Sequence, residues 1–204
     1  MSAPLLRLGR QEWAAVRALA LATLVLGLVY PLVLTLLAQA VVPGRADGAL
    51  VSRGGAVVGS SLIGQGFVSP SGDPVPQYFQ SRPSASSWDG AASGGSNLGP
   101  NSPELVAAVE QRRSAVAAFN GVPPSAVPAD AVTASGSGLD PGISPAYAQL
   151  QVSRVAAARG IAAGDVARLV AAATHGRDLG FIGDPWVDVL DLNLALDREF
   201  GAAG

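Results

Sequence analysis

The chain has 204 residues, and its 13 basic residues, all arginine, against 15 acidic residues give a net charge of −2 at pH 7. Because lysine is absent, the phosphate-binding loop of nucleotide hydrolases, Schiff-base chemistry and the lysine-containing phosphorylation motif of ion-pumping ATPases are excluded. The lack of cysteine and the single histidine, His175, exclude disulfides, thiolate catalysis and multi-histidine metal sites. An acidic chain with 5% aromatic residues also lacks the features of a nucleic-acid-binding protein.

An apolar segment near the N-terminus predicts a transmembrane helix over residues 13–42. No charged residue occurs from residue 18 to residue 44, and residues 18–42 include nine Leu and five Val. Such a run is long enough to cross a hydrocarbon core of about 30 Å. Pro31 removes one backbone donor from the helix and is expected to kink it, which favours a neighbouring helix that satisfies the freed carbonyl.

A cleaved secretory signal is the alternative, since Ala38-Gln39-Ala40 has the small-x-small form of a cleavage site. The apolar run exceeds the roughly 7 to 15 residues of a signal's apolar core, so a retained anchor is favoured. Arginine precedes the uncharged apolar run at three positions and follows it at two: Arg7, Arg10, Arg17, Arg45 and Arg53. This bias predicts a short cytoplasmic tail over residues 1–12 and an extracytoplasmic soluble domain over residues 45–204.

The soluble part divides into two regions of different composition. Residues 44–102 contain 12 Gly, 12 Ser and 5 Pro, and apolar residues recur between them. This pattern predicts short strands joined by glycine turns. Serine-proline starts and glycine stops then predict helices over 103–119 and 145–159, and a third is expected over 165–174. A strand over 186–190 and a short amphipathic helix to residue 200 follow. We therefore expect an α+β protein: a single N-terminal transmembrane helix followed by a Gly/Ser-rich mixed α/β extracytoplasmic domain.

Four loops rich in glycine and small polar residues are candidate functional segments: residues 59–65, 80–85, 93–100 and 132–141. Each has an architectural explanation as well, because glycine supplies left-handed turns and Ser, Thr and Asp satisfy backbone donors. For any one loop taken alone, architecture is the favoured interpretation.

Two other chemistries were weighed. A serine hydrolase could use Ser96 or Ser137 with His175, but no Gly-x-Ser-x-Gly elbow is present. Asp184, Asp188 and Asp191 lack calcium-loop spacing, so a solvated acidic face is the better interpretation. We expect no catalytic, cofactor-binding or metal-binding residues.

An ordered series of motifs nevertheless covers nearly the whole chain. It comprises Gly59-Ser60, Leu62-Ile63-Gly64-Gln65, Tyr78-Phe79, Arg82-Pro83-Ser84, residues 93–100 and 132–141, Ile143-Ser144-Pro145, Gln151, Arg154, Arg159-Gly160, Gly176-Arg177, Leu179-Gly180-Phe181 and Leu192-Asn193-Leu194-Ala195-Leu196. In this series the chain resembles the KdpC family, the C subunit of the Kdp-type high-affinity potassium-transporting ATPase. It departs from the family where Gly142 replaces a usual histidine and where Asp188 replaces a usual asparagine.

The resemblance implies a non-catalytic accessory subunit in a bacterial inner membrane that raises the ATP affinity of a P-type ATPase subunit. The other partners implied are a potassium-channel-like subunit and a small single-span subunit, and ATP, K⁺ and Mg²⁺ would be handled by these partners. A stand-alone anchored binding module and a secreted enzyme are the alternatives. The residues expected in family-motif or partner-contact loops are Gly64, Gln65, Arg82, Pro83, Ser93, Gly94, Gly95, Ser96, Asn97, Ser135, Gly136, Ser137, Asp140, Gln151 and Arg154, with Arg82 and Asp140 as buried polar anchors.

Overall fold

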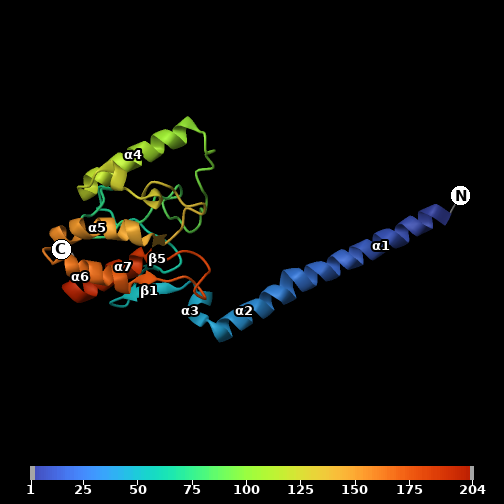
Figure 1. Cartoon of the computed structure of the whole chain (residues 1–204). Coiled ribbons are helices and arrows are strands. Elements are labelled where there is room, and N and C mark those ends of the chain that lie inside the picture. Colours follow the sequence, from blue (N-terminus) through green and yellow to red (C-terminus); the bar gives the residue numbers. More distant parts are fainter. Residues whose placement is uncertain (1–2, 203–204) are drawn as a thin grey trace. The chain divides into compact units, whose positions relative to one another are not determined.

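A computed structural model describes the backbone of residues 3–202 and the side chains of residues 9–202. The chain divides into two compact units, Met1–Leu50 and Val51–Gly204 (Figure 1). Each unit is described by itself.

The first unit is a long helix with one irregular turn. α1 (Ala3–Leu24) continues through a π-helical turn, η1 (Val25–Val29), into α2 (Tyr30–Val41), and the short α3 (Pro43–Ala46) follows. The segment Gly9–Val41 is long and apolar enough to cross a membrane, with a mean hydropathy of 2.3. The expected transmembrane segment, residues 13–42, is therefore helical as far as Val41.

The irregular turn lies immediately before Pro31. The backbone N–H of Tyr30 donates to the carbonyl of Val25, five residues back, in place of the usual four. Because Pro31 has no N–H, the helix cannot continue its regular ladder at this position, and the wider turn accommodates the missing donor. The disturbance expected from proline thus takes the form of a π turn.

Helices of the second unit begin and end at the residues that the sequence marks. α4 (Pro103–Asn120) is capped by the Ser102 hydroxyl, and α5 (Pro145–Arg159) by the Ser144 hydroxyl, which accepts the N–H of Tyr147 at 3.0 Å. Both end at a glycine in the left-handed conformation, Gly121 and Gly160. Two single 3₁₀ turns, Pro124–Ala126 and Ala129–Ala131, follow α4, and α6 (Ala163–Ala172) and α7 (Val189–Phe200) complete the set.

Two small sheets accompany these helices. β1 (Leu50–Arg53) pairs with β2 (Ala56–Ser60), and a second sheet has the order β3 (Gly142–Ile143), β5 (Trp186–Asp188), β4 (Thr174–His175). β5 is central and antiparallel to both neighbours, with Ile143 and Thr174 facing Val187 from either side. The mixture of helices and small antiparallel sheets confirms the predicted α+β class.

One apolar core joins the helices and the second sheet. α5 packs against α6 and α4, and α6 packs against α7 (Figure 1). Fully buried apolar side chains come from α5, α6, α7, β5 and the irregular segment before α4, and they include Phe79, Val155, Val166, Val187, Leu192 and Leu196. Phe79 thus anchors a segment without regular structure in the same core as the helices.

Three element boundaries differ from expectation. The third helix is Ala163–Ala172 rather than 165–174, and Thr174 belongs to β4. The strand expected over 186–190 ends at Asp188, because its carboxylate accepts the N–H of Asp191 at 2.9 Å and caps α7. Within the described residues 44–102, β1 and β2 are the only named strands, residues 44–46 belong to α3, and the rest is irregular.

Candidate functional site

An irregular segment, residues 76–80, is held against the core by side chains rather than by a neighbouring strand. The Asn193 amide accepts the N–H of Phe79 at 2.8 Å and donates to its carbonyl at 3.0 Å. The Gln151 amide accepts the N–H of Gln80 at 2.7 Å and donates to its carbonyl at 3.1 Å. Each amide side chain satisfies both backbone groups of one residue, as a strand partner would, so the segment needs no ladder.

Arg154 extends this arrangement from the next turn of α5. Its guanidinium donates to Gln151 at 2.7 Å, to Asn120 at 2.9 Å and to the Tyr78 carbonyl at 3.0 Å, and it lies 4.4 Å from the Phe119 ring centroid. Burial lowers the pKa of Arg154 to about 10, so the group stays charged at neutral pH. Gln151 and Arg154, both expected as motif residues, therefore bind the backbone of the same segment, residues 76–80.

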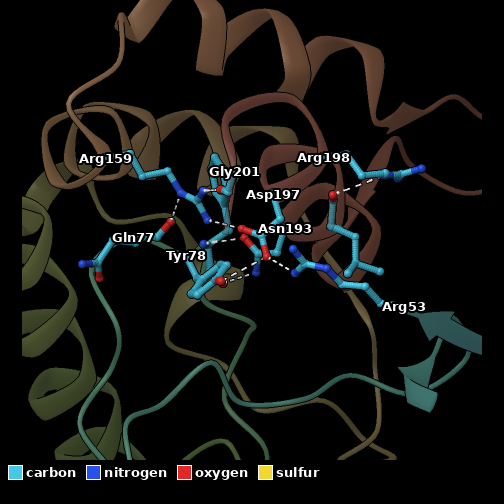
Figure 2. A network of polar contacts seen from close by, with 10 residues as sticks. Arg53, Gln77, Tyr78, Arg159, Asn193, Asp197, Arg198 and Gly201 are labelled. Atoms are coloured by element: carbon cyan, nitrogen blue, oxygen red, sulfur yellow. Dashed lines mark hydrogen bonds and ion pairs between the residues drawn. The ribbon is translucent and has the colours of Figure 1, made fainter. Parts of the chain in front are cut away.

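A buried carboxylate, Asp197, holds the same region from α7 (Figure 2). Asp197 accepts from Arg159 at 2.8 Å, from the Tyr78 hydroxyl at 3.1 Å and from the Arg53 guanidinium. Arg159 also donates to the carbonyls of Gln77 and Gly201 and lies over the Tyr78 ring at 4.8 Å. Asp197 therefore joins β1, the irregular segment 76–80, α5 and α7 through one side chain.

Asn193 and Asp197 carry much of this arrangement, and the sequence analysis did not identify them as a site. They lie four residues apart on α7, each directly after a buried leucine, Leu192 or Leu196. A polar pair at i and i+4 within an apolar stripe was the available signal, because buried polar groups require partners.

The predicted glycine and serine loops converge on a single loop junction, residues 84–95 and 135–139. The N–H of Gly94 donates to the Ser137 carbonyl at 2.8 Å, and the Ser93 hydroxyl donates to the same carbonyl at 3.0 Å. A side chain at Gly95 would come within 2.9 Å of the Gly136 carbonyl. The two loops therefore approach each other backbone to backbone, which only glycine permits.

The junction continues toward the first family motif. The Ser84 hydroxyl donates to the Gly138 carbonyl at 2.6 Å and accepts the N–H of Trp88 at 2.9 Å. The N–H of the buried Gly64 donates to the Leu139 carbonyl at 2.9 Å, and any side chain there would collide with the Asp140 carbonyl. The hydroxyl of Ser81 donates to the Gln65 carbonyl at 2.8 Å. These small residues join loops that are far apart in the sequence.

Arg82 and Asp140 form an ion pair at 2.8 Å. Arg82 also donates to the Thr133 carbonyl, and Asp140 accepts the N–H of Gly142. Their side chains are 21% and 37% exposed, so the pair is partly accessible rather than fully buried. Next to it, the backbone of Ser135 donates to the Pro83 carbonyl at 3.4 Å.

The Arg82–Asp140 pair lines a cleft of about 390 Å³, and Trp186 also lines this cleft. The indole ring of Trp186 lies over Gly142, where an added β-carbon would come within 2.7 Å of the ring. On its other side the ring stacks on His175 with centroids 4.5 Å apart. Trp186 therefore covers the position at which the resemblance leads one to expect a histidine.

The remaining predicted loop residues, Ser96 and Asn97, are exposed at the edge of the junction, and Asn97 has a positive φ of 53°. The three aspartates weighed as a cation site do not act together: Asp188 is buried as a helix cap, whereas Asp184 pairs with Arg177 at 3.0 Å. Across residues 9–202, no group of three His, Asp or Glu side chains could hold a metal ion.

Comparison with known proteins identifies the group to which this arrangement belongs. The family model described as "K+-transporting ATPase, c chain" matches residues 12–198. The chain belongs to the KdpC family. A potassium-transporting ATPase KdpC subunit from Kineococcus radiotolerans is 54% identical over 198 residues, covering 96% of this chain and 97% of the relative.

Two further KdpC subunits are similar over most of their length. The Beijerinckia indica subunit is 52% identical over 184 residues, covering 89% of this chain and 90% of the relative. The Burkholderia mallei subunit is 53% identical over 181 residues, covering 87% and 91%. Membership of the family makes the chain an accessory subunit of a potassium-transporting ATPase complex, distinct from the catalytic subunit.

Proposed function

We propose that this KdpC-family chain raises the apparent ATP affinity of the P-type ATPase subunit indirectly, through contacts outside the nucleotide site. Its partners in this proposal are that catalytic subunit, a potassium-channel-like subunit and a small single-span subunit. ATP, K⁺ and Mg²⁺ are then handled by the partners. The curated relatives named as subunits of a potassium-transporting ATPase support the assignment to such a complex.

The observation that carries the indirect mechanism is the internal use of the glycine and serine loops. The donors and acceptors of Ser84, Ser93, Gly94 and Ser137 are directed at one another's backbones. A nucleotide-binding loop instead presents free N–H groups to phosphate. Loops that are already paired within the chain favour a structural role over nucleotide contact.

The orientation predicted from arginine supports the same mechanism. With the N-terminus cytoplasmic, residues 51–204 lie outside and cannot reach cytoplasmic ATP. The domain then caps the outer face of the channel-like subunit, while the helix containing the π turn packs against a partner's membrane span. If the chain binds one conformation of the pump more tightly than another, it shifts the conformational equilibrium and with it the apparent ATP affinity.

Purification of the full chain from native membranes tests this function. We expect a C-terminal tag, in mild detergent and from cells grown at low potassium, to recover a P-type ATPase and a large channel-like subunit, identified by mass. A stand-alone binding module would be recovered alone with its helix. Recovery alone and without residues 1–40 would indicate a secreted protein, and either result would contradict the proposal.

A further inference from the structure

The ribbon between β4 and β5 ends in an apolar tip, residues 179–182. Asp178 and Ile182 are joined by two backbone hydrogen bonds of 3.0 and 2.9 Å, and three residues form the turn between them. At this tip Leu179 is 84% exposed and Phe181 is 72% exposed. Among the described residues of the second unit, these are the most exposed large apolar side chains.

Folding of this chain does not explain Leu179. Its φ of 53° lies in the left-handed region, which is sterically unfavourable for a residue with a β-carbon. Asn or Gly suits that conformation better, and a polar side chain suits the exposure better. Leucine is thus unfavourable on both grounds in the free chain. Strain of this kind, when it coincides with exposed apolar surface, indicates a contact made with something else.

The tip could enter either a lipid bilayer or an apolar recess on a protein, and the charge of the domain favours the protein. Residues 51–204 contain 9 Arg and 13 Asp or Glu, a net charge of −4, and the tip itself is flanked by Asp178 and by the ion-paired Arg177 and Asp184. An acidic domain is repelled by anionic lipid headgroups. An apolar recess on a protein, by contrast, accepts Leu and Phe anchors surrounded by a polar rim.

The tether limits which protein can supply the recess. Nine residues, 42–50, separate the end of α2 from the second unit. Nine residues span at most about 30 Å. A partner within this reach is embedded in the membrane that holds the helix, or lies against it.

We propose that residues 179–182 insert into an apolar recess on a membrane-embedded partner subunit of the potassium-transporting ATPase complex. This rests on the proposed function, because it requires the chain to assemble with that complex. Binding relieves the exposure of Leu179 and Phe181, while the Arg177–Asp184 ion pair at the base of the tip, at 3.0 Å, keeps the ribbon formed before docking.

The first test uses the double variant Leu179→Asn/Phe181→Ser in the full chain. Asparagine fits the φ of Leu179, so the variant should unfold at the same temperature as the original or slightly higher. We expect recovery of partner subunits through the tag to fall at least tenfold. The matched control is Val106→Ser, which removes an apolar side chain that is 51% exposed on α4 and should leave recovery unchanged.

The second test places a photocrosslinking amino acid at position 179 in native membranes. A crosslink to a large partner subunit is the expected result. Two results would show that the tip is not the docking element: the double variant co-purifies with the partners as well as the original chain does, or position 179 crosslinks only to lipid. In either case the accessory function still stands. If the original chain recovers no partner at all, the accessory function itself fails, and the docking proposal fails with it.

Discussion

Replacing Asp197 with alanine should lower the free energy of unfolding of the second unit by about 3–5 kcal/mol. Asp197 has a side chain that is 4% exposed, and it pairs with Arg159, which is 5% exposed. Without the carboxylate, the Arg159 guanidinium remains buried with no counter-charge, and the Tyr78 hydroxyl loses its acceptor. The cost therefore arises from the charge left behind more than from the lost ion pair itself.

Glu199→Ala is the matched control for Asp197→Ala. Glu199 lies on the same helix and pairs with Arg168, but that ion pair is on the surface, with side chains 37% and 58% exposed. Because exposed ion pairs contribute little to stability, removing it should cost far less than removing Asp197. Urea unfolding of the full chain in mild detergent, followed by the fluorescence of Trp88 and Trp186, measures both. Equal losses in the two variants would contradict the role given to Asp197.

Replacing Asp188 with asparagine should stabilise the second unit at neutral pH by about 1–3 kcal/mol. Burial raises the pKa of the Asp188 carboxyl from 3.8 to about 6, an effect that its hydrogen bond to Asp191 and the charge of His175 only partly offset. At pH 7 the carboxyl is ionised in both states, but its ionisation is less favourable in the folded chain, which lowers the stability by about 1.4 kcal/mol for each pKa unit. Asparagine keeps the oxygen that caps α7 and removes the charge.

The stability gained by Asp188→Asn should depend on pH. Between pH 3.8 and about 6 the folded chain binds a proton at Asp188 that the unfolded chain has released, so this group's contribution to stability falls as pH rises through that window. Above it the destabilisation is complete, and below it the carboxyl is neutral in both states. The advantage of Asp188→Asn should accordingly be largest near pH 7.5 and close to zero below about pH 4. An advantage of equal size at both pH values would contradict the assignment.

Local signals in the sequence predicted the helices well. Ser102 and Ser144 cap α4 and α5, and Gly121 and Gly160 end them, because capping and left-handed termination depend on neighbouring residues only. The start of α7 was misplaced, since the apolar run across Val189 and Leu190 suits a strand as well as a buried helix face.

The candidate site was predicted only in part, because its contacts join residues distant in the sequence. The resemblance indicated Gln151, Arg154 and the glycine loops, yet not what they touch. Asp197 meets a guanidinium 144 positions away, and Arg82 meets Asp140 across 58 positions. No local pattern specifies such pairs. Whether Arg82 and Asp140 also contact a partner subunit stays a prediction.

The glycine loops illustrate why a motif can be diagnostic of a family without being a ligand site. Gly64, Gly95 and Gly138 each lie where a side chain would meet another loop's backbone. Substitution there forces the loops apart, so the residue types follow from packing. The glycine loops are therefore occupied by contacts within the domain. The most pronounced exposed apolar feature of the domain is instead the tip, residues 179–182.

The indirect mechanism requires the second unit to lie on the outer side of the membrane. Cysteine labelling measures on which side of the membrane this unit lies. The chain contains no cysteine, so Ser96→Cys, in an exposed loop, and Gln11→Cys, in the expected cytoplasmic tail, each give a single site. In sealed right-side-out vesicles, a membrane-impermeant maleimide should label Ser96→Cys at once and Gln11→Cys only after permeabilisation. Labelling in the opposite order would place the domain beside cytoplasmic ATP and contradict the indirect mechanism.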